Sequence, residues 1–118
     1  MSMSWKDVRA WVDRLDGEGD DLVAQTLDRV ASIPPEQELE HVACEQAIAA
    51  AEIVASSAGA APDTLPQQVR RYVEHHGVPD EELLLAAFRA VERIGMQRDE
   101  HDDALVDLEE RLGALVSA

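Results

Sequence analysis

The sequence predicts an all-α fold: a compact bundle of five to six mostly antiparallel helices around a long central helix at about residues 35–57. Apolar residues recur at helical spacing along most of the chain, and no segment shows the alternation of a half-buried strand. Aromatic residues make up only 3% of the chain, so the core must be aliphatic and alanine-rich, which suits closely packed helices. Short connections between the helices favour antiparallel neighbours.

Chain length and composition set the domain organisation. With 118 residues, the chain is the size of one domain, and we expect residues 1–118 to form a single helical unit. The apolar share of 46% is too high for a disordered chain, although the net charge is −15.

The N-terminal part predicts two helices separated by an acidic break. An apolar series runs from Trp5 to Leu15 at helical spacing. Residues 16–20, with the sequence DGEGD, interrupt it. A second helix is expected from about Asp21 to the segment around Pro34-Pro35.

The third helix is the predicted centre of the bundle. A proline at its first turn is consistent with a start near residue 35, and Gly59 is expected to end it. Its alanine tract is interrupted by one charge, Glu52. A helix that is apolar on several faces belongs inside a domain, so a buried Glu52 would need a partner, and we expect an arginine.

Three further helices are expected in the C-terminal half. The first covers about Pro66 to His76 and is closed by Gly77. The next follows residues 78–80, and its inner face extends to Ile94. The last one carries a leucine-rich face over residues 105–116.

The charge balance is the most informative global property. Ten Lys and Arg residues stand against twenty-five Asp and Glu residues. Such a surface repels phosphate backbones, which argues against nucleic acid as a partner, and attracts a basic protein. The plainer interpretation is that the charge keeps a small domain soluble.

Targeting signals are absent from the sequence pattern. The single cysteine, Cys44, is typical of a reducing compartment, and the N-terminus shows no signal peptide. The longest weakly polar run, residues 47–61, contains Glu52 and is no membrane span. We therefore expect a cytoplasmic protein that does not associate with membranes.

A stripe of polar residues on the central helix is a candidate metal site. Glu38, His41, Glu45 and Glu52 follow helical spacings, and Glu-x-x-His is the spacing used in di-iron bundles. His41 and Cys44 are also spaced to share a zinc ion. No second Glu-x-x-His motif occurs, so the stripe is better interpreted as the wetter side of the helix.

The acidic segment Asp16–Asp21 resembles the start of a calcium loop. Its sixth position is Asp21 instead of glycine, and its twelfth is Leu27 instead of glutamate. Helix capping and the helix dipole explain these acids better than calcium does.

Arg70 with His75, and Arg71 with His76, both read Arg-x-x-x-x-His. This pattern is similar to the motif of the HEPN ribonucleases, which are all-helical domains of about this size. The resemblance implies that arginine and histidine act on the scissile phosphate and the ribose hydroxyl. A histidine just before Gly77 is equally explained by its favourable interaction with a helix C-terminus.

Most of the chain resembles a bacterial family of helical proteins, domain of unknown function 4259 (DUF4259). The residues that carry the resemblance are the run LEHVACEQAIAAAEIVA within Glu38–Ala55, Gly59, Leu65-Pro66, Val69, and the segment ALVDLEERL from Ala104 to Leu112. The resemblance implies a helical fold and no known activity, so it assigns no functional residues.

The sequence therefore predicts a non-catalytic protein-interaction module, such as an immunity or inhibitor protein that masks a basic partner. It assigns no catalytic, cofactor-binding or metal-ligating residue and no cofactor. A small HEPN-like ribonuclease and a metal- or ligand-binding bundle are the alternatives, so catalysis is left open. A homodimer is a further open alternative. Trp5 and Trp11 are six residues apart and cannot share one narrow helix face, so an exposed tryptophan is a candidate contact for a second copy of the chain.

Overall fold

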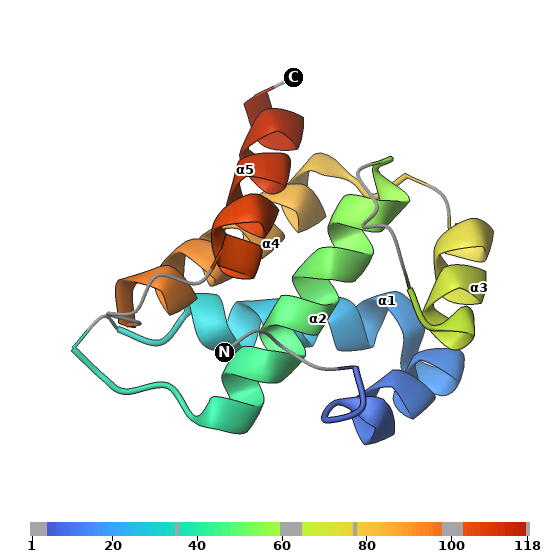
Figure 1. Cartoon of the computed structure of the whole chain (residues 1–118), viewed down its shortest axis with the longest axis horizontal. Helices are drawn as coiled ribbons and strands as arrows, with labels where there is room; N and C mark the ends of the chain where they lie inside the picture. Colours follow the sequence, from blue (N-terminus) through green and yellow to red (C-terminus); the bar gives the residue numbers. More distant parts are fainter. Residues whose placement is uncertain (1–4, 35, 60–64, 77, 98–102, 118) are drawn as a thin grey trace.

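In the part of the chain that it describes, the computed structural model of this protein contains five α-helices (Figure 1). They are α1 (Arg9–Ala31), α2 (His41–Ser57), α3 (Gln67–His76), α4 (Glu81–Gln97) and α5 (Asp103–Ser117). The structure describes residues 5–34, 36–59, 65–76, 78–97 and 103–117, and these contain no strand. The predicted all-α fold is confirmed.

Helix α2 occupies the centre of the bundle and contacts each of the other four helices (Figure 1). The backbone of its middle turns is surrounded on all sides, since Ala47, Ala49, Ala50 and Ala51 are 0% exposed. Alanine permits this close approach because its side chain ends at Cβ. The predicted central helix is confirmed in position and in its end, where Gly59 adopts a left-handed φ of 98°.

The predicted start of that helix near residue 35 is wrong. Helix α2 begins at His41, residues 36–40 are not helical, and Pro35 lies outside the described residues. Arg93 of α4 explains the difference. Its guanidinium is buried and donates hydrogen bonds to the backbone carbonyls of Ile33, Pro34 and Gln37 at 2.5–2.9 Å. These carbonyls serve a side chain from a distant helix instead of an extra turn of α2.

Helix α1 consists of two helical segments joined at a kink. Only Gly19 has a non-helical backbone, with φ 54° and ψ −131°, so the predicted break over residues 16–20 is confined to one residue. The first segment begins at Arg9 and not at Trp5, which lies in a preceding turn.

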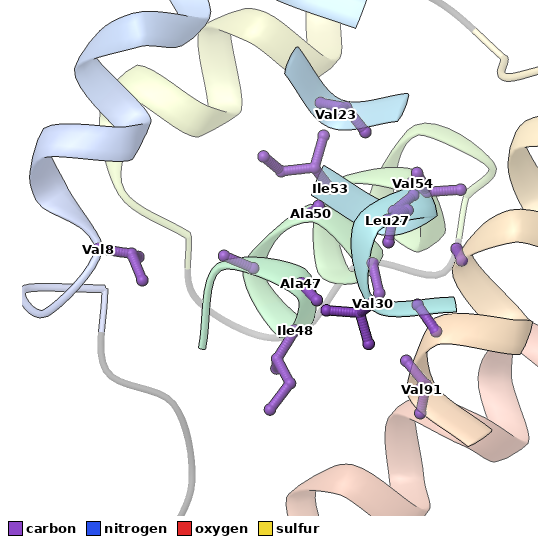
Figure 2. Packing of buried hydrophobic residues seen from close by; sticks show 14 of the residues in the cluster. Val8, Val23, Leu27, Val30, Ala47, Ile48, Ala50, Ile53, Val54 and Val91 are labelled. Carbon is purple, nitrogen blue, oxygen red and sulfur yellow. The ribbon is translucent and has the colours of Figure 1, made fainter. Parts of the chain in front are cut away.

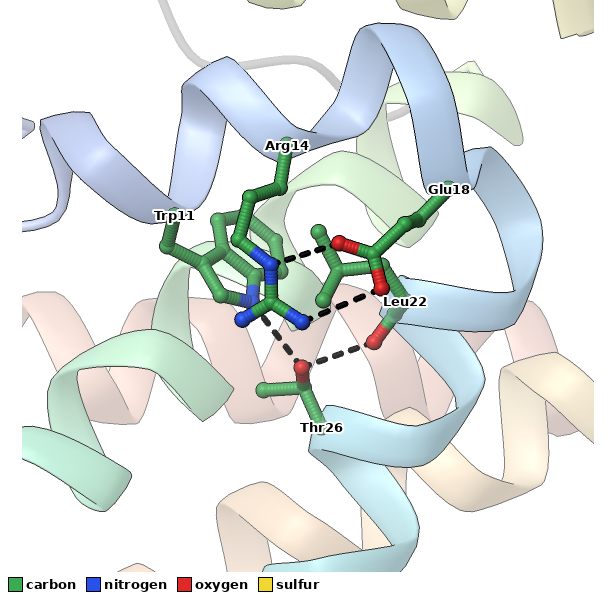
Figure 3. A network of polar contacts seen from close by, with 5 residues as sticks. All are labelled: Trp11, Arg14, Glu18, Leu22 and Thr26. Atoms are coloured by element: carbon green, nitrogen blue, oxygen red, sulfur yellow. Dashed lines mark hydrogen bonds and ion pairs between the residues drawn. The ribbon is translucent and has the colours of Figure 1, made fainter.

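A buried hydrogen bond joins the two segments of α1 (Figure 3). The indole of Trp11 donates to the hydroxyl of Thr26 at 2.9 Å, and that hydroxyl donates to the carbonyl of Leu22 at 2.7 Å. Trp11 is buried and Trp5 is half-buried against the core. On the exposed side, Arg14 pairs with Glu18 one turn later at 2.6 Å.

The three C-terminal helices agree with their predicted positions. Helix α3 is fastened to α1 by Gln68, whose amide donates to the carboxylate of Asp16 at 3.2 Å. Helices α4 and α5 run in opposite directions and pack together, and α5 also contacts α2 (Figure 1).

The buried hydrophobic residues form one cluster at the centre of the bundle. Figure 2 shows Val23, Leu27 and Val30 of α1 facing the alanines and Ile53 of α2. The Cα radius of gyration is 12.9 Å. A compact domain of this length is expected at about 13.5 Å.

No helix in the described part of the chain has both the length and the apolar character needed to cross a membrane.

Candidate functional site

A cavity of about 490 Å³ opens where α1, α2, α3 and the start of α4 meet. Its lining comprises Asp20, Asp21, Val23, Ala24 and Asp28 of α1, Ile53, Val54 and Ser57 of α2, Tyr72 of α3, the connecting residues Val78, Pro79 and Asp80, and Glu82, Leu83 and Ala86 of α4. A volume of this size is within the range of pockets that bind small molecules.

The lining has two chemically distinct parts. The exposed part is the acidic rim, formed by the five carboxylates of Asp20, Asp21, Asp28, Asp80 and Glu82. The less exposed part is the apolar floor, formed by Val23, Ala24, Ile53, Val54, Leu83 and Ala86. A groove with this lining offers contact to aliphatic surface below and negative charge above.

No arginine, lysine or histidine side chain that the structure describes lines the cavity. Three arginines are engaged elsewhere: Arg14 with Glu18, Arg111 with Glu52 and Arg93 with backbone carbonyls. The negative charge of the acidic rim is therefore not compensated from within the cavity.

Local helix chemistry explains four of the five rim carboxylates. Asp20 and Asp21 follow the kink at Gly19 and lie in the first turn of the second segment of α1, where the helix dipole favours negative charge. The carboxylate of Asp80 accepts a hydrogen bond from the backbone N–H of Leu83 at 2.8 Å and so caps α4. Glu82 lies in the first turn of that helix.

Asp28 is the exception. It lies in the last turn of α1, where the dipole disfavours a carboxylate. It is seven residues after Asp21, which places both on the same face of the helix. Capping therefore does not account for Asp28, and its position on the rim requires another explanation.

Tyr72 connects α3 to the rim. Its hydroxyl donates a hydrogen bond to the carboxylate of Asp20. Burial of the ring, together with the hydrogen bond and charge of Asp20, raises the pKa of Tyr72 far above its ordinary value. The phenol therefore stays protonated and continues to donate to Asp20 throughout the physiological range.

An exposed apolar residue stands beside the cavity. Val78, in the connection between α3 and α4, is 80% exposed and contributes to the lining. Among the described residues it is the most exposed large hydrophobic side chain.

The candidate zinc ligands His41 and Cys44 do not lie at a common site in the structure. His41 is exposed and its Nε2 lies 2.8 Å from the carboxylate of Glu45, whereas Cys44 is buried in the core. Among the described residues, no three His, Cys, Asp or Glu side chains are placed to hold a metal ion. His101 lies outside the described residues.

The predicted polar stripe on the central helix is wrong at its first member. Glu38 precedes the start of α2, so the Glu-x-x-His pattern is not on a helix. Glu52 lies on α2 and is 15% exposed, and Arg111 binds it through two hydrogen bonds of 2.7 and 3.1 Å. The expected arginine partner of Glu52 is confirmed.

Both Arg-x-x-x-x-His pairs lie on α3, and Arg70, Arg71 and His75 are not part of the cavity lining. Arg70, Arg71 and His75 are exposed, and the Nδ1 of His75 lies 2.8 Å from the backbone carbonyl of Arg71. Tyr72, from the same helix, is the residue that lines the cavity. The side chain of His76 is not among those described, and the ribonuclease interpretation stays a prediction.

Residues 16–21 do not form a calcium loop. They are helical on both sides of Gly19, so their carboxylates leave the helix in different directions. Asp20 and Asp21 belong to the cavity, while Asp16 binds Gln68 of α3.

Residues 7–118 match the family model described as domain of unknown function DUF4259. The chain belongs to the DUF4259 family. The predicted resemblance is thereby confirmed over nearly the whole chain. Comparison with curated proteins and with solved structures gives no match. The description of the family states no activity.

Proposed function

We propose that this DUF4259 protein is a non-catalytic interaction module that binds a basic protein partner, in the manner of an immunity or inhibitor protein. The observation that carries the proposal is the acidic cavity, in which five carboxylates surround a groove without a basic side chain in the described lining. We place the protein in the cytoplasm, because a chain with a single cysteine suits a reducing compartment.

Electrostatics supports this proposal at long and short range. The net charge of −15 attracts a basic partner and speeds encounter, particularly at low ionic strength. The uncompensated acidic rim then supplies a specific place where carboxylates replace the water around positive groups of the partner. Long-range attraction alone would not select one partner, whereas a shaped cavity does.

Affinity capture with three forms of the protein tests the proposal. The cavity variant carries Asp21→Asn, Asp28→Asn and Glu82→Gln, and it keeps Asp20 and Asp80, which have structural hydrogen bonds. The surface variant carries Asp13→Asn, Glu92→Gln and Glu110→Gln. All three of its positions are exposed and outside the cavity, so the two variants change the net charge equally.

The wild-type protein and the surface variant should retain a basic protein from the lysate of the source organism at low salt. The cavity variant should lose it, and added salt should release it from the first two. Retention of the same proteins by all three forms, or of no basic protein by any of them, would contradict the proposal.

A further inference from the structure

We infer that the cavity receives an arginine side chain of the basic partner, with the aliphatic stem on the apolar floor and the guanidinium among the carboxylates of the acidic rim. This inference rests on the proposed function and specifies how the partner binds. Three observations support it: the apolar floor beneath the carboxylates, the separation of the carboxylates from one another, and their mutual repulsion.

The lining matches a long amphipathic cation. Val23, Ile53 and Val54 form a buried apolar surface beneath exposed carboxylates. Arginine and lysine lay their methylene stems on apolar surface while the charged head stays in a polar environment. A metal ion or a small hydrated cation would leave this floor unused.

The arrangement of the carboxylates favours arginine over lysine. No three of the five converge as they would around a metal ion, so there is no compact cage for a point charge. A guanidinium is planar, carries five N–H donors and is weakly hydrated, so it can serve separated carboxylates while its face contacts apolar groups. An ammonium is small and strongly hydrated and matches such a site less well.

Repulsion among the rim carboxylates opposes folding, although local helix chemistry favours four of the five. The carboxylates of Asp21, Asp28 and Glu82 make no hydrogen bond or ion pair with another described residue, and like charges around one groove repel each other. Asp28 is in addition opposed by the dipole of α1. A cationic side chain in the cavity removes both penalties at once.

Val78 provides an apolar contact outside the cavity. Its side chain is 80% exposed and stands next to Pro79 and Asp80 in the lining. In the complex, a partner residue next to the inserted arginine would cover Val78. The complex would then combine one buried cation with a small apolar contact at the entrance.

Titration of the ¹⁵N-labelled protein with two matched probes tests the inference. N-acetyl-arginine amide and N-acetyl-lysine amide carry the same single charge and the same backbone. The arginine probe should produce saturable chemical-shift changes in residues 20–28 and 78–86. It should bind at least about threefold more tightly than the lysine probe, since only guanidinium has the planar donor set.

Three variants separate insertion into the cavity from general electrostatic attraction. The cavity variant should lose the saturable shifts, whereas the surface variant should keep them. Ala86→Leu keeps every charge but fills part of the apolar floor, and it should weaken the arginine probe by about fivefold or more. Unchanged binding to the Ala86→Leu protein would overturn insertion into the cavity.

The remaining outcomes also give clear answers. No saturable shift, or equal binding of both probes, would overturn the choice of arginine. Tighter saturable binding of spermidine than of the arginine probe would overturn it in favour of a free polyamine. In each case, a basic protein captured only by forms with an intact rim would still support the proposed function, so the two failures are distinguishable.

Discussion

Gly19 allows α1 to fold back on itself and brings Asp20 and Asp21 to the cavity. Its φ of 54° with ψ of −131° lies in a region of backbone conformation that is essentially reserved for glycine. The turn also places Trp11 against Thr26, fifteen residues later, and buries the indole. One residue therefore determines both a core contact and one side of the cavity.

Gly19→Ala should lower the free energy of unfolding by about 1–3 kcal/mol, because a Cβ strains this conformation. Gly17→Ala is the matched control: Gly17 is helical, and nothing lies within 4 Å of an added Cβ. That change should leave stability unchanged or raise it by up to about 1 kcal/mol. Urea unfolding measures both. Equal effects of the two substitutions would contradict the assigned role of Gly19.

Tyr72 is the only tyrosine of the chain, so its ionisation can be followed directly by the ultraviolet absorbance of tyrosinate. We expect the folded protein to titrate well above the ordinary tyrosine pKa of about 10, owing to burial and to Asp20. An ordinary pKa in the folded protein would show that the ring is not held beside Asp20.

The same pKa shift has a consequence for stability. The folded state holds the phenolic proton more tightly than the unfolded state, so this contribution is complete below about pH 10 and is lost as the pH rises toward the folded pKa. Tyr72→Phe should remove that part of the alkaline loss of stability. Urea unfolding on both sides of about pH 10 compares the two proteins.

At the scale of whole helices, an ion pair fastens α5 to the central helix. Arg111 of α5 binds the carboxylate of Glu52 with both terminal nitrogens, and its Nε lies 2.9 Å from Asp107 on the same helix. Burial lowers the pKa of Arg111, but the hydrogen bonds and charges of Glu52 and Asp107 together outweigh it and raise the pKa overall. The pair lets a charged residue occupy the alanine tract of α2.

Arg111→Gln should lower the free energy of unfolding by about 2–3 kcal/mol, because it leaves Glu52 largely buried without its counter-charge. Asp107→Asn removes only a carboxylate that is 66% exposed and should cost less than about 0.5 kcal/mol. Urea unfolding of both variants provides the comparison. A loss at Asp107 as large as that at Arg111 would show that α5 is not held mainly through Glu52.

The helices could be predicted wherever local signals determine them. The leucine spacing of α5 and the glycine after α2 are contained in their own segments, and both predictions are correct. The start of α2 could not be predicted, because Arg93 takes up carbonyls of the preceding connection from about sixty residues away. Local propensity contains no signal for such a contact.

The cavity also could not be predicted from local sequence patterns. Its acids come from two segments, 20–28 and 80–82, and each group resembles ordinary acids near a helix end. The only local signal was Asp28, a carboxylate in the last turn of a helix, which capping does not explain. The fold is what brings these acids around one groove.

At the scale of the whole molecule, we interpret the acidic rim as a stability cost that is retained for binding. Asp28→Asn, which removes the one rim carboxylate that a helix dipole opposes, should therefore stabilise the protein by roughly 0.5–1 kcal/mol, and more than Asp13→Asn, which neutralises an acid outside the cavity. High salt should shrink the difference, because it screens exposed like charges. An Asp28→Asn protein that is less stable than the Asp13→Asn protein would contradict this interpretation.

The most direct test of the account is the affinity of the captured basic partner for the wild type, the cavity variant and the surface variant, measured by calorimetry over a range of salt concentrations. We predict similar affinity for the wild type and the surface variant. The cavity variant should bind about ten- to a hundredfold more weakly, with a shallower dependence on salt. Equal affinity of all three forms would show that the cavity is not where the partner binds.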